Sequence, residues 1–209
     1  MNPKAKQFLL HRDAGMGNAT RYADGIERLA YDVAFVSQLI PDQDGEVLDL
    51  CCGTGMMSVA MAKKAKTVVA VDFNMEFLKR IPKRENLIVR QADAAGFCLQ
   101  DCQFDLITIF GAIQYNTGAD VKNIYSNCYQ MCRRGGHLVV SGQWGVKNRV
   151  TVNRWSEELQ ADYFAEYRTL EEETSLLQDV GFHTDLAKIL PDRFNRFEDT
   201  KFMGIVATK

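Results

Sequence analysis

The sequence lacks the features that mark membrane, nucleic-acid and zinc-binding proteins. No apolar run approaches the roughly 18 residues that a membrane-spanning helix requires. The formal net charge of −2 gives no bulk basic field that would attract nucleic acid. There are only three histidines and no Cys-x-x-Cys pair, so no metal site is predicted. We therefore expect no membrane contact, no nucleic-acid partner and no metal.

The six cysteines show no metal-binding spacing. Cys51 and Cys52 are adjacent, and the other four form two pairs at i, i+4 spacing. Small side chains that fill the core on helix faces account for this pattern. Cysteines of this kind are typical of a reducing compartment, and residues 1–12 carry neither the apolar core nor the cleavage site of a secretory signal. The expected location is the cytoplasm.

Residues 46–55, with the sequence EVLDLCCGTG, carry the strongest functional signal. Their apolar residues predict a buried strand that ends in a turn at Gly53 and Gly55. Glycine allows the backbone to turn sharply and lets a ligand approach it closely. A helix expected over residues 54–65 would direct its N-terminal amides toward that ligand.

A second signal is Asp72, which ends the apolar strand expected over residues 67–71. A carboxylate at this position typically accepts hydrogen bonds from ribose hydroxyls. Together, the glycine turn and Asp72 predict a cofactor that contains adenosine.

Two adenosine cofactors fit this pattern, and Asp49 separates them. A dinucleotide site prefers Gly or Ala at the third small position of the Gly-x-Gly-x-x-Gly motif, and Ser58 occupies that position here. Because Ser is also small, this difference alone separates the two cofactors only weakly. Asp49 lies inside the strand end, where its charge would repel a pyrophosphate. It suits a cofactor with cationic groups, as S-adenosylmethionine has. A nicotinamide cofactor stays as the more distant alternative.

At this point the chain resembles the class I S-adenosylmethionine-dependent methyltransferases of the small-molecule type. Five segments match the family's motifs in order, over roughly residues 45 to 142, and they are Asp49–Gly55, Val69–Asn74, Gln91–Ala95, Phe104–Gly111 and Gly135–Ser141.

The resemblance implies which residues bind the cofactor. Asp49 and the turn from Gly53 to Gly55 would face the methionine end, Asp72 the ribose and Phe73 the adenine. Asp93 and Ala94 would read the adenine amino edge. The full set implied is Asp49, Cys51, Gly53, Thr54, Gly55, Asp72, Phe73, Asp93, Ala94 and Phe110.

Periodicity and length predict one α/β domain over residues 1–209. Only residues 191–200 separate the last two expected strands, too few for a helical crossover, so these strands should be antiparallel. The resemblance implies a Rossmann-like, seven-stranded sheet, mostly parallel with a C-terminal antiparallel hairpin. The expected strands are 47–50, 67–71, 87–90, 106–110, 137–141, 182–190 and 201–208, and the expected helices are 21–40, 54–65, a short one after Asn74, 121–131 and 169–180.

Two segments lie outside this alternation. Residues 1–20 are polar and glycine-containing, and we expect a mobile arm there. Residues 143–167 hold five aromatic residues and two arginines and follow the fifth strand. This insertion could be a lid or a substrate wall, or a surface helical excursion whose aromatics pack on the body.

No catalytic residue is identified from the sequence. Gln114 and Tyr115 follow the fourth strand and could orient an acceptor, Tyr22 lies on the helix that precedes the first motif, and His11 lies in the expected arm. His137 and His183 are expected to be remote from the site. A thiol or free amine as acceptor would need no strong base.

The predicted function is transfer of a methyl group from S-adenosylmethionine to an O, N, C or S atom of a small-molecule acceptor. The Asn/Asp-Pro-Pro-Tyr sequence of nucleobase and glutamine methyltransferases is absent, since residues 111–114 read GAIQ. The alternatives are an RNA or protein methyltransferase and a non-catalytic cofactor-binding subunit. A homodimer through the loop of residues 191–200 is also possible.

Overall fold

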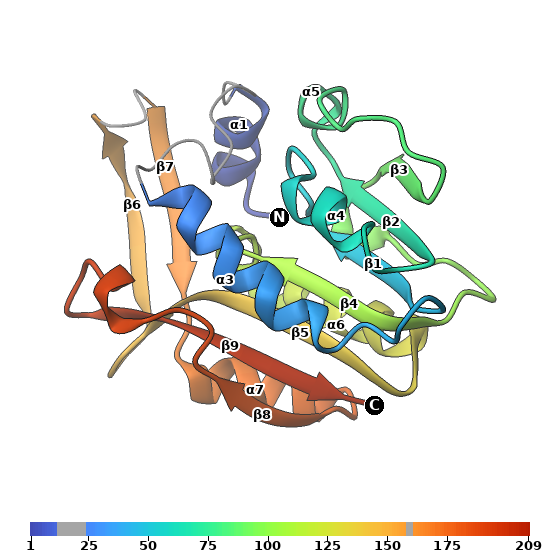
Figure 1. Ribbon diagram of the computed structural model, residues 1–209. Helices are drawn as coiled ribbons and strands as arrows, with labels where there is room; N and C mark the ends of the chain where they lie inside the picture. Colours follow the sequence, from blue (N-terminus) through green and yellow to red (C-terminus); the bar gives the residue numbers. More distant parts are fainter. Residues whose placement is uncertain (12–23, 158–160) are drawn as a thin grey trace.

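The computed structural model describes residues 1–11, 24–157 and 161–209. Its main element is a seven-stranded sheet with the order β3-β2-β1-β4-β5-β9-β8, in which β9 is antiparallel to both of its neighbours (Figure 1). The predicted fold class, including the C-terminal antiparallel hairpin, is confirmed. The strands are β1 Glu46–Leu50, β2 Thr67–Asp72, β3 Leu87–Gln91, β4 Phe104–Phe110, β5 Cys132–Gly145, β8 His183–Ala187 and β9 Thr200–Thr208.

Helices cover both faces of the sheet, because its central strands are apolar on both sides. One apolar cluster joins the sheet to α3 (Gly25–Ser37), α4 (Met56–Met61) and α5 (Met75–Leu78). A second cluster, on the opposite face, joins it to α6 (Gly118–Met131) and α7 (Leu170–Asp179). Two buried layers therefore hold the carboxyl ends of β1, β2 and β4 at one edge of the molecule.

Local sequence signals set several helix starts. The side chain of Asn74 accepts a hydrogen bond from the Glu76 amide, 3.0 Å away, at the start of α5. Thr169 and Glu172 form the reciprocal capping box predicted for α7. Both starts are confirmed. The helix predicted over residues 54–65 is shorter, because regular α-helix is limited to α4.

The insertion expected over residues 143–167 contains a β-hairpin. β5 runs on to Gly145, and β6 (Val150–Ser156) then pairs with β7 (Ala161–Tyr167) in a separate two-stranded sheet. The hairpin stands beside the main sheet in Figure 1. The alternative of a helical excursion is wrong, because both segments are extended and pair with each other, and both are rich in the aromatic and β-branched residues that favour strands.

The arm expected over residues 1–20 begins with a helix, which corrects that expectation for its first part. α1 (Pro3–His11) buries Ala5, Phe8 and Leu9, which share one face at helical spacing. α1 packs against β7, where the rings of Phe8 and Tyr163 meet edge to face at 5.6 Å. The remaining residues of the expected arm lie outside the described part of the chain. Across the described ranges, no helix is long and apolar enough to span a bilayer.

Candidate active site

A cavity of about 550 Å³ lies at the carboxyl edge of β1, β2 and β4. Its walls come from segments far apart in the chain: α3, the turns after β1 and β2, the segment after β4, the β6–β7 hairpin and the start of β9. In open parallel sheets, ligands bind at this edge. The volume lies within the range of small-ligand sites.

The turn after β1 lines this cavity with its backbone. Gly53 has a φ of 56°, and a Cβ atom added to it would meet nothing within 4 Å. Gly55 has a φ of 74°, but an added Cβ would lie 2.6 Å from Ile81 Cγ1. Gly53 therefore leaves room for a ligand, whereas Gly55 allows the turn to pack on the protein.

Cys51, in the same turn, is not a glycine and has a φ of 65°. Such a conformation costs about 1–3 kcal/mol and persists only where the surroundings hold it. Here the Cys52 amide donates to the Val71 carbonyl, 2.9 Å away, which fixes the turn against β2. Burial raises the pKa of both thiols well above the ordinary value, so they stay protonated at neutral pH.

Asp72 joins the two turns and lines the cavity. One carboxylate oxygen accepts from the Gly53 amide and the other from the Asn74 amide, each at 2.9 Å. Burial raises the pKa of Asp72, and these hydrogen bonds oppose that effect. Each oxygen has a further lone pair, so the group can also accept from a ligand hydroxyl.

Asp49 is not among the residues that line the cavity. Its carboxylate accepts hydrogen bonds from Ser58 Oγ and from Thr108 Oγ1, the latter at 2.9 Å. Burial raises the pKa of Asp49 to about 6, although both hydroxyls lower it. Its role toward the methionine end of the cofactor stays a prediction.

Of the residues predicted to contact the adenine, one lines the cavity, and the roles of all three stay predictions. Phe73 lines the cavity, but Asp93 and Ala94 do not. Asp93 Oδ1 instead accepts from the Ala95 amide, 3.1 Å away, and caps the 3-10 helix η1 (Ala94–Gly96). Of the ten residues implied, those lining the cavity are Cys51, Gly53, Thr54, Asp72, Phe73 and Phe110.

Gln114 and Tyr115 both line the cavity, from the 3-10 helix η2 (Ile113–Tyr115). Gln114 Nε2 donates to the Gly111 carbonyl at 2.9 Å, while its buried Oε1 has no hydrogen-bond partner. An unpaired buried acceptor is costly, so it marks a position where a ligand donor would be stabilised. Tyr115 packs edge to face on Tyr163, with ring centroids 6.1 Å apart.

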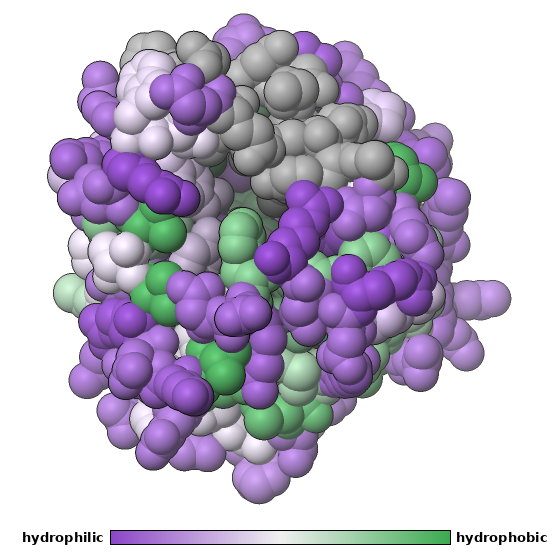
Figure 2. All heavy atoms as spheres, turned by 90° about the vertical axis from the view of Figure 1, so that its left-hand side faces the viewer, coloured by the Kyte–Doolittle hydropathy of each residue, from purple (hydrophilic) through white to green (hydrophobic). Residues whose placement is uncertain are grey.

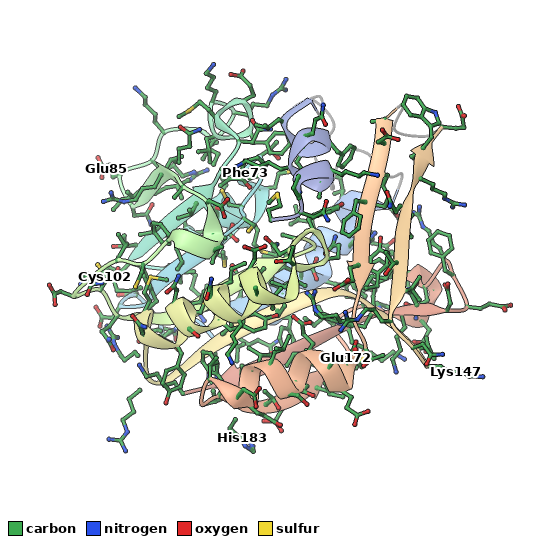
Figure 3. All side chains as sticks on the ribbon, turned by 180° about the vertical axis from the view of Figure 1, so that it is seen from behind. Phe73, Glu85, Cys102, Lys147, Glu172 and His183 are labelled. Carbon is green, nitrogen blue, oxygen red and sulfur yellow. The ribbon has the colours of Figure 1, made fainter. Side chains whose placement is uncertain are left out.

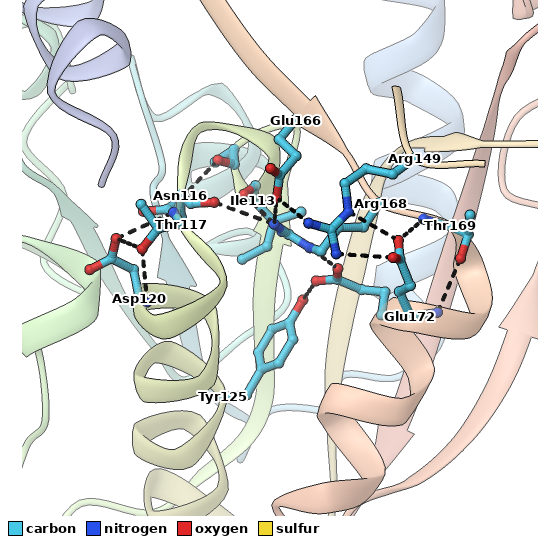
Figure 4. A network of polar contacts seen from close by, with 12 residues as sticks. Ile113, Asn116, Thr117, Asp120, Tyr125, Arg149, Glu166, Arg168, Thr169 and Glu172 are labelled. Carbon is cyan, nitrogen blue, oxygen red and sulfur yellow. Dashed lines mark hydrogen bonds and ion pairs between the residues drawn. The ribbon is translucent and has the colours of Figure 1, made fainter. Parts of the chain in front are cut away.

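A buried arginine that the sequence did not single out holds this segment (Figure 4). Arg168, 2% exposed, donates to the carbonyls of Ile113 at 3.2 Å and Asn116 at 3.3 Å, on either side of the Gln114–Tyr115 pair. Its Nε donates to Glu173 at 2.6 Å, and Tyr125 donates to the same carboxylate. The network anchors the cavity wall to α6 and α7.

Asp32, on α3, is the second cavity residue that sequence reasoning missed. It lines the cavity on the same stripe of the helix as Gly25, Arg28 and Leu29. Its Oδ1 is buried and has no hydrogen-bond partner among the described residues. Burial raises the pKa of Asp32 to about 7, and the nearby Arg28 charge lowers it. The sequence signal that could have identified Asp32 is the presence of an acidic residue among the apolar positions of the helix.

The structure does not place the remaining two candidates relative to the site. Tyr22 lies outside the described residues, and His11 ends α1 with a side chain that is not described. His137 contacts Thr208, and neither His137 nor His183 lines the cavity. Figure 3 shows Phe73 and His183 at opposite ends of the molecule. Over residues 1–11, 24–157 and 161–209, no cluster of three His, Cys, Asp or Glu could hold a metal.

The loop before β9 is tied to α3. Arg193 donates to Glu27 at 2.6 Å, and Arg196 donates to Asp24 at 2.9 Å. The loop therefore closes one side of the cavity through contacts within the chain.

Figure 2 shows the side of the molecule where β6 and β7 lie. Apolar patches are scattered there among polar side chains.

Comparison with known proteins agrees with this arrangement. Residues 47–136 match the family model described as "Methyltransferase domain". Demethylmenaquinone methyltransferase of Lactobacillus johnsonii is 33% identical over 90 residues, 37% of this chain. The enzyme of that name from Lactiplantibacillus plantarum is 29% identical over 115 residues, 50% of this chain. The chain spans only 37% and 47% of the length of these two relatives.

Solved structures extend the likeness to the whole fold. A complex of DhpI with SAM and HEP superposes with a TM-score of 0.71 and 15% identity, covering 100% of both chains. A SAM-dependent methyltransferase of Leishmania major has a TM-score of 0.75 and 17% identity, covering 99% of this chain and 82% of that one. At these identities the likeness shows the fold.

The sheet order, the glycine turn beside Asp72 and the matching segment agree with one another. The chain has the fold of the class I methyltransferases, and its residues 47–136 are similar to a methyltransferase domain.

Proposed function

We propose that this protein transfers a methyl group from S-adenosylmethionine to a small-molecule acceptor. The observation that carries the proposal is Gly53, whose backbone opens onto the cavity while its amide is held by the carboxylate of Asp72. The six unpaired cysteines favour a reducing location, the cytoplasm.

One side of the cavity fits the cofactor. We call it the cofactor wall, and it consists of Cys51, Cys52, Gly53, Thr54, Asp72 and Phe73. Gly53 leaves space for close approach, Asp72 can accept from ribose hydroxyls, and Phe73 supplies an apolar surface for the adenine. The bound cofactor would supply an activated methyl group on a sulfonium. Asp49 would add negative charge behind the turn.

The other side fits an acceptor of limited size. We call it the acceptor wall, and it consists of Arg28, Asp32, Gln114, Tyr115, Tyr163 and Phe202. Arg28 lies over the Phe202 ring, 4.3 Å from its centroid. This wall therefore combines three aromatic rings with three polar or charged side chains. Such a wall orients a small molecule and excludes water, which promotes displacement at the methyl carbon. The β6–β7 hairpin contributes Tyr163 and acts as a substrate wall.

Isothermal titration of the dialysed protein with S-adenosylmethionine, S-adenosylhomocysteine and NADH tests the proposal. Binding of the first two without the third is the expected result. Homocysteine release, coupled to S-adenosylhomocysteine formation and dependent on added small acceptors, then measures turnover. Binding without turnover across small acceptors, but with turnover on RNA or protein, would replace the small-molecule acceptor by a macromolecule. Failure of both adenosyl ligands to bind would reject the function.

A further inference from the structure

The acceptor wall contains a carboxyl oxygen without a hydrogen-bond partner. Among the residues that the structure describes, none donates a hydrogen bond to the buried Oδ1 of Asp32. Burial of an unpaired carboxylate costs stability, so a folded chain usually pairs such a group. Because Asp32 lines the cavity, a bound molecule is the partner that the geometry allows.

Asp32 lines the same cavity as the end of β4. Phe110, the last residue of β4, and Leu29, one turn before Asp32 on α3, both line this cavity. An acceptor bound between α3 and the end of β4 would therefore lie within the cavity that Asp32 lines. Arg28, one turn earlier, is held over Phe202.

We propose that Asp32 accepts the proton of the acceptor through Oδ1, and that the acceptor atom is the oxygen of a hydroxyl group. This inference rests on the proposed function. The hydroxyl oxygen forms the new bond to the methyl carbon, and the carbon–sulfur bond breaks with its electron pair passing to sulfur. The hydroxyl proton moves to Asp32 and later to solvent. A hydroxyl must lose its proton in this reaction, so a positioned base accelerates it.

The electrostatics of the cavity support this role. The pKa of Asp32, raised to about 7 by burial, is matched to proton transfer near neutral pH. Arg28 on the same helix is the charge that lowers it. Gln114 Oε1 is a second buried acceptor without a partner on the same cavity. The other titratable groups lining the cavity are Cys51, Cys52, Asp72, Tyr115, Arg154, Tyr163, Tyr167, Arg196 and Asp199.

The first test measures Asp32 without any acceptor. The carboxyl carbons of the protein are labelled with ¹³C, and the Asp32 resonance is assigned by its loss in Asp32→Asn. Its pKa is then compared in complexes with S-adenosylmethionine, which carries the sulfonium charge, and S-adenosylhomocysteine, which does not. We expect the pKa of Asp32 to be lower by at least about half a unit in the S-adenosylmethionine complex, because the positive sulfonium stabilises the ionised carboxylate at short range. Equal pKa values would place Asp32 away from the methyl group and overturn the proposal.

Unfolding measured against pH gives an independent readout. An acid with a folded pKa of about 7 and an unfolded pKa near 3.8 destabilises the folded chain as pH rises between those values. Relative to Asp32→Asn, the unfolding constant of the natural protein should therefore rise about 100-fold between pH 5 and pH 8.5. Asp179→Asn, an exposed aspartate on α7, is the matched control and should show no such change. If the ratio of the unfolding constants of the natural protein and Asp32→Asn did not change with pH, Asp32 would not have a pKa raised by burial.

The third test uses phenol, aniline and thiophenol as probes that differ only in the acceptor atom. We expect phenol to be methylated by the natural protein and the rate to fall at least 100-fold in Asp32→Asn, with S-adenosylhomocysteine affinity within threefold. In the natural protein the methylation rate should rise with pH near pH 7, as Asp32 ionises. Loss of this pH dependence in Asp32→Asn would identify Asp32 as the group that accepts the proton. An undiminished rate in Asp32→Asn, with the natural protein binding cofactor, would overturn this inference alone. A natural protein that binds neither adenosyl ligand would instead reject the proposed function.

Discussion

The two walls of the cavity are built in different ways. The cofactor wall comes from two short segments, each at the carboxyl end of a strand, and within each segment its residues are consecutive in the sequence. The acceptor wall gathers residues from α3, η2, β7 and β9, which are up to about 170 positions apart. A wall made of local turns keeps its geometry through backbone hydrogen bonds. A wall made of distant elements depends on packing and on buried ion pairs.

The largest expected effect breaks the acceptor wall and leaves the cofactor wall in place. Arg168→Met removes the partner of the fully buried Glu173 and should lower the free energy of unfolding by about 3–5 kcal/mol. Urea denaturation measures this loss. Adding Glu173→Gln to the variant should restore part of it, because the unpaired charge is then gone. A loss below about 1 kcal/mol would show that the ion pair does not anchor η2.

The next effect breaks the cofactor wall. Gly53→Val places a branched side chain where the cavity is open and where φ is 56°, so cofactor affinity should fall at least 100-fold, about 3 kcal/mol. Calorimetry with S-adenosylhomocysteine measures the affinity. Gly118→Ala is the matched control, since an added Cβ there also meets nothing and φ is not positive. A folded Gly53→Val protein that still binds normally would show that the cofactor lies elsewhere.

A smaller change sharpens the assignment of the ribose contact. Asp72→Ala removes the acceptor of two backbone amides and of the predicted ribose hydroxyls, so cofactor binding should weaken by about 1–3 kcal/mol. Asp72→Asn keeps the shape but loses the charge, and it separates the two contributions. Unchanged calorimetric affinity in both variants would reject the ribose role.

The smallest effect tests whether the walls are independent. Tyr163 and Tyr167 share a hydrogen bond between their hydroxyls at 2.9 Å on the hairpin strand β7. Tyr163→Phe removes that bond and should lower the free energy of unfolding by about 1 kcal/mol. Cofactor affinity should stay within a factor of two, while KM for an accepted small molecule should change. A parallel loss of cofactor affinity would show that the hairpin also supports the cofactor wall.

The difference between the walls also explains what the sequence could predict. The strand-turn pattern at Gly53 and the acid at Asp72 are local, so their position at the sheet edge follows from the chain direction. The seven strands and the final hairpin follow from apolar periodicity and from the short loop between the last two strands. The capping box at Thr169 is likewise a local signal.

Contacts between distant elements could not be read in the same way. The sequence did not reveal that Ser58 and Thr108, from two other elements, donate hydrogen bonds to the carboxylate of Asp49. Asp32 and Arg168 acquire their roles only when α3 and β7 meet the sheet edge. Aromatic residues in the insertion fitted a helix or a lid equally well, because strand pairing between β6 and β7 depends on partners outside each segment.

The two ends of the insertion meet. The Gly145 amide, at the end of β5, donates to the Arg168 carbonyl at 3.0 Å, so residues 146–167 leave the body and return at one point. A segment with joined ends can be replaced by one of another length without redirecting the strand before it or the helix after it. The length of the hairpin is therefore not fixed by the strand before it or the helix after it. A hairpin of another length would change which molecules fit beside Asp32, while the turn at Gly53 stays intact.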